Sequence, residues 1–341
     1  MKKIKTEDAV GSVLCHDMTR IVKDEIKDAV FRKGHIVTEE DIPLLLSMGK
    51  DHIFVYEKKV GMIHENDGAL ALAELCIDDN MVSTEVKEGK IELKAECDGF
   101  FQVDVHRLDR INELDDIMIA TRKGNIPVKK GEKLAGMRVI PLVIEEEKLN
   151  RARDIAGDSP ILKLTPFKDL KAGIVTTGNE VYHGRIKDTF TPVIREKLND
   201  MGIEVVKHII SDDDTENIKS GILDIKKEGV DLIICTGGMS VDPDDLTPAA
   251  IKSSGANIVT YGAPVLPGAM FLLAYFDDGT TIMGVPGCAM YKKITIFDII
   301  LPYVSAGIQI DKVNIAKLGY GGLCLDCDIC HYPNCQFGKG L

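Results

Sequence analysis

Four cysteines close to the C-terminus form the densest group of reactive side chains in the sequence. They follow the pattern Cys-x-x-Cys-x-x-Cys-x-x-x-x-Cys and are Cys324, Cys327, Cys330 and Cys335. In a chain that keeps its thiols reduced, so tight a group indicates a metal site rather than disulfides. Four thiolates at this spacing can surround one metal ion or one iron–sulfur cluster. We therefore predict a metal centre at these residues.

Two kinds of centre fit the four cysteines. The two short gaps are similar to the spacing in ferredoxin-like [4Fe–4S] proteins, but the last gap has four residues where ferredoxins have three. Zinc fits the number of thiolates equally well, although zinc sites more often use two separated Cys-x-x-Cys pairs. We favour iron, because three thiolates come close together and Pro333 stiffens the approach to the fourth. An unstructured reactive tail is the remaining alternative.

A second group of candidate residues lies in glycine-rich turns that follow apolar runs. Thr176-Thr177-Gly178-Asn-Glu180 follows one such run, and Thr236-Gly237-Gly238-Met-Ser240 follows another. The glycines allow the backbone to approach a phosphate or a pterin closely, and the hydroxyl groups can donate to an anion. A tight turn at the end of a strand is the alternative for each stretch alone.

Acidic residues accompany these turns. Asp212 begins a run of three aspartates, and Asp242, Asp244 and Asp245 follow the second glycine-rich turn. Carboxylate oxygens are well suited to Mg²⁺ that bridges a diphosphate. Acids also favour helix N-termini, so solvated capping loops are the alternative. Two Pro-Gly turns, Pro267-Gly268 and Pro286-Gly287, are only loops when each is taken alone.

The elements that must position these turns alternate between strands and helices from Lys171 onward. The expected strands cover residues 172–177, 203–210, 231–235, 270–275 and 281–285, and the expected helices cover 192–201, 215–228, 246–253 and 289–305. Repeated strand–helix units predict an α/β domain with a doubly wound, mostly parallel sheet. Ligands of such sheets bind beyond the carboxyl ends of the strands, which is where the turns fall.

The first 150 residues predict a small, β-rich α+β half. A helix is expected at residues 38–49 and a buried strand at 52–56. Two alternating runs, 90–96 and 100–105, are separated by Cys97-Asp98-Gly99 and predict a hairpin. The expected domains are a small α/β segment (1–60), a β-rich domain (61–150), a linker (151–170), the α/β domain (171–306) and the cysteine-rich tail (307–341).

Charge and hydropathy exclude two classes of partner. The net charge is −12 and no long basic tract concentrates the 42 Lys and Arg residues, so we expect no binding to nucleic acid. No apolar run reaches the length of about 20 residues that spans a bilayer, so we expect no membrane segment. The N-terminus has no apolar signal region, and we expect a cytoplasmic protein. Assembly into homo-oligomers stays open.

The order of the motifs in one strand–helix series resembles the molybdenum-cofactor biosynthesis domain. Molybdopterin molybdenumtransferases and molybdopterin adenylyltransferases share this domain, and the likeness covers about 135 residues from Lys171 to Ala306. The resemblance implies that molybdopterin or adenylylated molybdopterin binds across the turns, with Mg²⁺. The implied binding residues are Thr176, Thr177, Gly178, Asp188, Thr236, Gly237, Gly238, Ser240, Pro267, Gly268, Pro286 and Gly287.

The same resemblance implies a reaction. Acids matching Glu180, Asp212 and Asp245 would organise the metal, the adenylate and molybdate, and molybdate would enter the pterin with release of AMP. The metal would neutralise the charge that develops as the phosphoanhydride breaks. The chain departs from the transferases in having Asp242 where they have Gly and Ala269 where they have Lys, which removes a cation for the oxyanion. Lys292 and Lys293 are candidate substitutes.

Three function classes therefore stay open. The first is an enzyme of molybdenum-cofactor assembly, and the second is a cofactor-binding or regulatory protein without turnover. The third is a nucleotide pyrophosphatase of the competence-damage type, which Asp244-Asp245-Leu-Thr-Pro also resembles. Gly319, Gly321 and Gly322 are expected to let the cysteine tail swing, either over the pterin site or toward a redox or molybdoenzyme partner.

Overall fold

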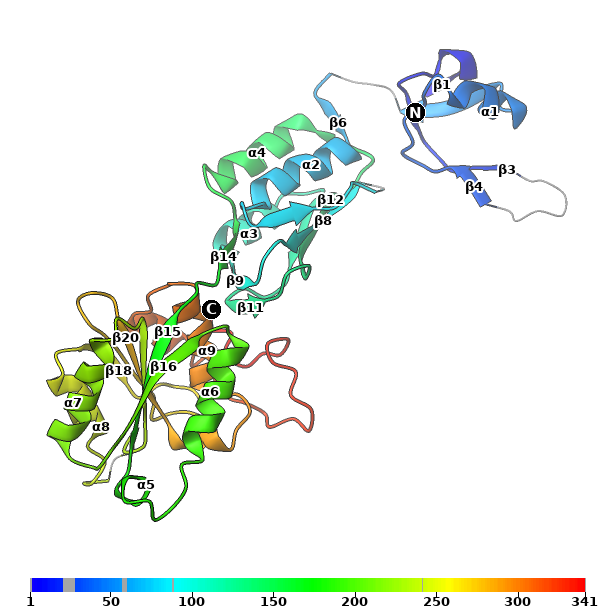
Figure 1. Cartoon of the computed structure of the whole chain (residues 1–341). Helices are drawn as coiled ribbons and strands as arrows, with labels where there is room; N and C mark the ends of the chain where they lie inside the picture. The colour runs from blue at the N-terminus through cyan, green and yellow to red at the C-terminus, as the bar shows by residue number, and fades with distance from the viewer. Residues whose placement is uncertain (1, 21–27, 57–59, 88, 241, 341) are drawn as a thin grey trace. The chain divides into compact units, whose positions relative to one another are not determined.

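The computed structural model of the chain describes residues 2–20, 28–56, 60–87, 89–240 and 242–340 (Figure 1). These residues divide into two compact units. The N-terminal unit consists of residues up to 96 together with 103–122 and 131–163. The C-terminal unit consists of 97–102, 123–130 and the residues from 164 onward. The chain thus passes more than once between the units before the α/β domain begins.

A mostly parallel sheet forms the centre of the C-terminal unit, and the mixed α/β fold predicted from the sequence is confirmed. Its strands are β15 (Lys171–Thr177), β16 (Glu204–Ser211), β17 (Leu232–Thr236), β18 (Asn257–Tyr261), β19 (Leu272–Tyr275) and β20 (Thr281–Val285). Their order is β16-β15-β17-β20-β19-β18. Strands β16, β15, β17 and β20 run parallel to one another, and β19 is antiparallel to both β20 and β18. All the strands except β18 were expected from the sequence.

Helices cover both faces of this sheet (Figure 1). Helices α6 (Phe190–Asp200) and α9 (Ile296–Ser305) lie on one face, and α7 (Thr215–Lys226) and α8 (Thr247–Ser253) lie on the other. Strand β17 is buried along its whole length because its alternate side chains enter two different cores. Ile234 packs in the core beneath α6 and α9, while Ile233 packs in the core beneath α7. Burial on both faces explains why the strand is a continuous apolar run.

The last predicted helix of the domain is broken in two. A 3-10 turn covers Gly287–Met290, and α9 begins only at Ile296. Thr295 and Asp298 form a reciprocal capping box that starts α9 at this point. Two shorter helices were not predicted, α5 (Asn179–Tyr182) and α10 (Lys312–Lys317), and α10 lies in the segment expected to be a tail.

The expected hairpin over residues 90–105 is wrong. Strand β8 (Lys90–Ala95) pairs with β12 (Lys133–Val139) and β7 (Met81–Ser83) in the N-terminal unit. Strand β9 (Gly99–Val103) instead lies between β11 (Ile126–Val128) and β14 (Leu162–Pro166). Gly99 is required there, because a Cβ atom at this position would lie 2.6 Å from the carbonyl oxygen of Thr165. Gly99 therefore allows β9 and β14 to approach closely, and it does not form a hairpin turn.

The rest of the N-terminal unit combines short strands and helices. Its further elements are β1 (Lys2–Lys5), a 3-10 turn (Thr6–Asp8), β2 (Val13–Leu14), β3 (Met18–Arg20), β4 (Asp28–Phe31), α1 (Asp41–Ser47), β5 (His52–Tyr56), β6 (Met62–His64), α2 (Glu65–Cys76), α3 (Val105–Asn112), β10 (Ile117–Thr121), β13 (Val143–Glu145) and α4 (Glu146–Ala156). Residues 151–170, expected as a linker, contain the end of α4 and β14. Strand β5 buries alternate residues rather than all of them.

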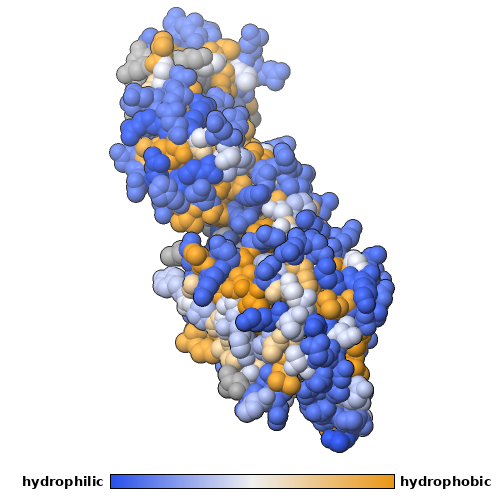
Figure 2. All heavy atoms as spheres, turned by 90° about the vertical axis from the view of Figure 1, so that its left-hand side faces the viewer, coloured by the Kyte–Doolittle hydropathy of each residue, from blue (hydrophilic) through white to orange (hydrophobic). Residues whose placement is uncertain are grey.

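The surface seen in Figure 2 is covered mostly by hydrophilic side chains, with smaller hydrophobic groups between them. Among the residues that the structure describes, no helix has the length and apolar character that a membrane span requires.

Candidate functional site

The motif turns gather at one edge of the parallel sheet. Strands β15, β16, β17 and β20 are parallel and in register, so the residues that follow them share the carboxyl edge of the sheet. The turn before β19 reaches the same edge, because Leu272 pairs with Gly284 near the end of β20. The turns that meet here contain Gly178, Asp212, Gly237-Gly238, Pro267-Gly268 and Pro286-Gly287. We call this group of turns the carboxyl edge.

The Gly237-Gly238 turn can be built only from glycine. Gly237 has a φ of 85°, and a Cβ atom on it would lie 2.2 Å from the carbonyl oxygen of Thr177. A Cβ atom on Gly238 would lie 2.8 Å from Thr247 Oγ1, which donates a hydrogen bond to the carbonyl of Gly237 at 3.0 Å. The turn therefore packs directly against the end of β15, and its close approach positions the backbone amides of the edge.

The threonine hydroxyl groups expected to reach an anion are used inside the protein. Thr176 and Thr177 are only 3% and 4% exposed, and Thr236 is fully buried. Thr176 Oγ1 lies 2.8 Å from Thr191 Oγ1 and 3.0 Å from His208 Nε2, and Thr177 Oγ1 lies 3.1 Å from Thr247 Oγ1. The turns thus present backbone and acidic groups outward, while the hydroxyl groups hold neighbouring elements together.

Asp188 has one structural role and one electrostatic neighbour. Its Oδ1 accepts hydrogen bonds from the backbone N–H groups of Phe190 (2.9 Å) and Thr191 (3.0 Å), which caps α6. Its Oδ2 lies 3.8 Å from Nε2 of His208. His208 was not singled out from the sequence, because a histidine in an alternating strand is most often structural. The structure therefore adds His208 and Thr191 to the residues that position Asp188.

Burial lowers the pKa of His208 below its usual 6.5, with Arg195 acting in the same direction and Asp188 opposing it. As the pH falls, the His208 imidazole therefore takes up a proton in the unfolded chain before it does so in the folded protein. The free energy of unfolding decreases from about pH 6.5 down to the lower pKa of the folded protein. We expect urea unfolding of His208→Gln to depend less on pH in this window than that of the wild type. His183→Gln, which changes an exposed histidine, should keep the wild-type dependence. Equal pH profiles for all three proteins would contradict the assignment.

The three consecutive aspartates have three different contacts. Asp212 accepts two hydrogen bonds from Asn217 Nδ2, at 2.9 and 3.1 Å. Asp213 accepts the backbone N–H of Asn179 at 2.8 Å, which ties the end of β16 to the turn after β15. Asp214 caps α7. The carboxylates of Asp213 and Asp214 accept backbone N–H groups, whereas that of Asp212 is bonded to a side chain. Asp212 is therefore the member of the run best able to bind a ligand or a metal ion.

Glu180 and Asp245 lie on the turns that follow β15 and β17. Glu180 is exposed, and its Oε1 would be 3.2 Å from a Cβ atom on Gly178, so its carboxylate lies close to that turn. Asp245 accepts the backbone N–H of Asp242 at 3.3 Å. Tyr261, which sequence reasoning missed, donates to the carbonyl of Ser240 at 2.9 Å. Burial, and after it the charge of Asp245, raise the pKa of Tyr261.

The acids of the edge do not form a metal site without a ligand. Within the described ranges, no three His, Cys, Asp or Glu side chains converge closely enough to hold a metal ion. Mg²⁺ in phosphate-binding sites commonly takes only one or two carboxylates and completes its shell with phosphate oxygens and water. Asp212, Glu180 and Asp245 therefore suit a metal ion that arrives with a phosphorylated ligand.

The cysteine tail is packed beside the Pro267-Gly268 turn of the carboxyl edge. The backbone N–H of Leu266, directly before Pro267, donates to the carbonyl of Gly322 at 2.8 Å. A Cβ atom on Gly322 would lie 2.4 Å from the carbonyl oxygen of Pro264. The glycine expected to let the tail swing therefore holds it close to the domain. Gly268 is equally tight, since its Cβ atom would lie 2.5 Å from Ile296 Cγ2.

Comparison with protein families adds independent evidence to this geometry. The family described as "Probable molybdopterin binding domain" matches residues 173–306. The resemblance to the molybdenum-cofactor biosynthesis domain is thereby confirmed for this segment. Residues 3–57 match a family described as a "Domain of unknown function (DUF8806)".

The curated relatives cover a shorter part of the chain. A CinA-like protein of Mycobacterium sp. (strain MCS) is 40% identical over 81 residues, which are 24% of this chain and 19% of the relative. A CinA-like protein of Mycobacterium avium is 38% identical over 77 residues, 23% of this chain and 18% of the relative. The chain thus spans about a fifth of the length of the curated relatives it matches.

Solved structures show a likeness over part of the chain. MoaB of Thermus thermophilus is 23% identical, with 39% of this chain and 91% of MoaB covered and a TM-score of 0.32. The tungsten cofactor synthesizing protein MoaB of Pyrococcus furiosus is 20% identical, with 40% and 93% covered and a TM-score of 0.34. CinA of Thermoplasma acidophilum is 17% identical, with 40% and 98% covered and a TM-score of 0.34.

Proposed function

We propose that the C-terminal unit binds molybdopterin or adenylylated molybdopterin, together with Mg²⁺, at the carboxyl edge. The observation that carries the proposal is the convergence of the glycine-rich turns at this edge within a domain of the molybdopterin-binding family. Turns that only glycine can build bring backbone N–H groups close to a ligand, and such groups bind phosphate without any net positive charge. An acidic protein can therefore hold an anionic pterin nucleotide there.

The acids of the edge supply the metal ligands in this proposal. Asp245 and Asp212 would share Mg²⁺ with the diphosphate of the adenylate, and Glu180 would approach from the turn after β15. When bound, Mg²⁺ would neutralise the charge that develops if the phosphoanhydride is cleaved. The part that these residues play is to orient the ligand and to fix the metal ion against it.

Binding is better supported than insertion of molybdate. Ala269 stands where the transferases have a lysine, so this turn offers no cation to an oxyanion. Lys292 forms an ion pair with Asp326 of the tail at 2.8 Å, and both Lys292 and Lys293 line a cavity beside the cysteines. Lys292 is therefore engaged with the tail, and Lys293 lies beside it. We infer a molybdopterin-binding role in cofactor assembly, with molybdate insertion as its catalytic extension.

A second candidate has a specific observation in its favour. The curated relatives that match include CinA-like proteins, and Asp244-Asp245-Leu-Thr-Pro resembles the competence-damage-type nucleotide pyrophosphatases. In this alternative the same edge would hold a dinucleotide such as ADP-ribose, and water would cleave its phosphoanhydride with the help of a metal ion.

Replacement of Asp245 tests the proposed site. We expect Asp245→Asn to weaken Mg²⁺-dependent binding of adenylylated molybdopterin at least about tenfold, since a lost charge-assisted contact costs about 1.5–3 kcal/mol. Anaerobic titration calorimetry of the full chain measures this. Asp244→Asn is the matched control, because Asp244 is the exposed neighbour of Asp245, and it should bind almost as the wild type does. Equal affinities of Asp245→Asn and the wild type would remove Asp245 from the site.

The two candidate functions separate in a second measurement. The wild type is incubated with ADP-ribose and Mg²⁺, and release of AMP and ribose phosphate is followed by chromatography. We expect no hydrolysis if the protein serves the pterin. Rapid hydrolysis without measurable pterin binding would replace the proposal with the pyrophosphatase alternative.

A further inference from the structure

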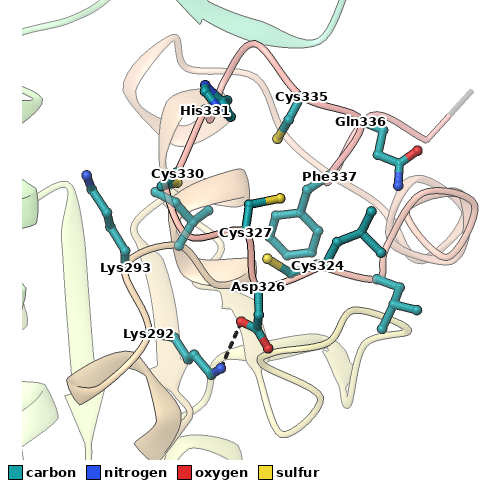
Figure 3. Close-up of a pocket in the computed structure, with 13 residues that line it drawn as sticks. Lys292, Lys293, Cys324, Asp326, Cys327, Cys330, His331, Cys335, Gln336 and Phe337 are labelled. Atoms are coloured by element: carbon teal, nitrogen blue, oxygen red, sulfur yellow. Dashed lines mark hydrogen bonds and ion pairs between the residues drawn. The ribbon is translucent and has the colours of Figure 1, made fainter.

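The four cysteines of the tail line one cavity (Figure 3). The cavity opens to solvent and has an empty volume of about 630 Å³. The cysteines around it are Cys324, Cys327, Cys330 and Cys335. The rest of the lining combines apolar with polar or charged side chains. They are Ile294, Leu323, Leu325 and Phe337, and Lys292, Lys293, Asp326, His331 and Gln336. Residues up to eleven positions apart in the sequence therefore face a common space, which the spacing alone did not establish.

Backbone pairing holds the start of this segment against the domain. Leu266 and Leu323 form a parallel bridge, in which the N–H of Cys324 donates to the carbonyl of Leu266 at 2.8 Å. The N–H of Gly338 donates to the carbonyl of Gly321 at 3.0 Å, so the two ends of the cysteine segment are tied to each other. Residues 322–337 thus form a closed loop rather than a free tail.

Side-chain packing fixes the far side of the loop. Phe337 is 3% exposed and belongs to the core beneath α9, and Cys324, Tyr332 and Cys335 pack against that core. Tyr332 donates to the carbonyl of Asp298 at 3.3 Å, and burial raises the pKa of its hydroxyl. Lys339 Nζ lies 4.5 Å from the centre of the Tyr332 ring. The cavity therefore has a packed inner wall, while Cys327 and Cys330 remain exposed at its mouth.

We propose that Cys324, Cys327, Cys330 and Cys335 bind one [4Fe–4S] cluster in this cavity. All nine cysteines of the chain are free thiols, so the four are available as thiolate ligands. Three of them come from a seven-residue segment and the fourth follows across the packed turn at Tyr332. Iron–sulfur clusters of this type are held by four cysteine thiolates.

The arrangement of the four cysteines favours a cluster over a single zinc ion. A structural zinc ion draws four sulfur atoms to about 2.3 Å from one point, which makes a small, closed site. The four cysteines of this chain instead line a cavity that is open to solvent. In a cluster, iron and sulfide ions lie between the thiolates, so ligands spread around a cavity are suited to it.

The charge and polarity of the lining are also suited to a cluster. Four thiolates give the loaded site a net negative charge, and Lys292 and Lys293 are the cations beside it. Lys292 is held in place by its ion pair with Asp326, which lies between Cys324 and Cys327. The lining also contains Leu323, Leu325 and Phe337, and the polarity and solvent exposure of a site are among the means by which a protein sets a cluster's potential.

Metal and sulfide content test the proposal directly. The full chain is purified without oxygen and reconstituted with Fe²⁺ and sulfide, and we expect about four iron and four sulfide ions per chain with a broad absorbance near ~400 nm. Cys327→Ser and Cys330→Ser should each lose most of the absorbance. Both residues are exposed, so their replacement should leave the unfolding midpoint of the apoprotein unchanged.

Cys288→Ser is the matched control, because Cys288 is a partly exposed thiol of the same unit that does not line the cavity. It should bind iron and sulfide as the wild type does. One tightly bound zinc per chain that resists replacement by iron would overturn the cluster. Absence of both metals after reconstitution would show that the four cysteines form no metal site. Loss of iron in Cys288→Ser alone would show that the cluster is bound elsewhere, with Cys288 as a ligand. None of these results depends on whether the pterin binds.

Discussion

Gly237→Ala should lower the free energy of unfolding of the C-terminal unit by about 3–5 kcal/mol and abolish pterin binding. Two effects add. An alanine at the observed φ of 85° is itself strained by roughly 1–2 kcal/mol. In addition, the new Cβ atom would lie 2.2 Å from the Thr177 carbonyl oxygen, so the turn must move away from β15. Chemical denaturation of the full chain, followed by circular dichroism, measures the loss.

Gly279→Ala separates the two effects. Gly279 has nearly the same φ, 89°, but a Cβ atom there would meet nothing within 4 Å. We therefore expect only the conformational cost of about 1–2 kcal/mol, with unchanged ligand binding. Equal losses in the two variants would show that the close approach of Gly237 to β15 contributes nothing.

Asp298→Ala should have the second large effect, a loss of about 3–5 kcal/mol. Its carboxylate forms an ion pair with Lys197 of α6, and the two side chains are only 11% and 14% exposed. The same carboxylate accepts the N–H of Thr295 at 2.7 Å and so caps α9. Its removal would leave the Lys197 charge partly buried without a partner and the start of α9 uncapped.

A double-mutant cycle checks the reason for this loss. Lys197→Met combined with Asp298→Ala should be less destabilised than the sum of the two single variants, because no unpaired charge remains. Asp224→Ala provides a surface control, since the side chains of Asp224 and its partner Lys227 are 46% and 75% exposed, and we expect little shift of the unfolding midpoint. Simple additivity at Lys197 and Asp298 would contradict a coupled pair.

The sequence was most informative where one physical signal dominated. Strand β17 is a continuous apolar run because both of its faces are buried, and a glycine follows its last residue. That pattern indicates where strands and turns lie along the sequence, whereas β18 and the antiparallel direction of β19 were not predicted. A helix-capping loop was one of the two interpretations of the aspartate run, and Asp214 caps α7 in the structure.

Sequence reasoning failed where distant contacts decide the structure. Gly99 signals a hairpin locally, but its close contact with Thr165 assigns it to another sheet. Thr176 and Thr177 have the hydroxyl groups that an anion site needs, and yet tertiary packing turns them inward. The partnership of His208 with Asp188 joins residues twenty positions apart, and no local pattern indicates it. The docked tail depends in the same way on Leu266, far from the cysteines.

The placement of β9 in the C-terminal unit has a consequence for synthesis of the chain. Phe100 is fully buried, and its ring lies 4.2 Å from that of Tyr303, measured between ring centres. Tyr303 is made some 200 residues later, which at about 5–20 residues per second is a delay of roughly 10–40 s. During that interval the nascent chain carries an aromatic strand without its final partner. Chaperone binding to ribosome-bound chains should therefore be strongest between emergence of Phe100 and emergence of Tyr303.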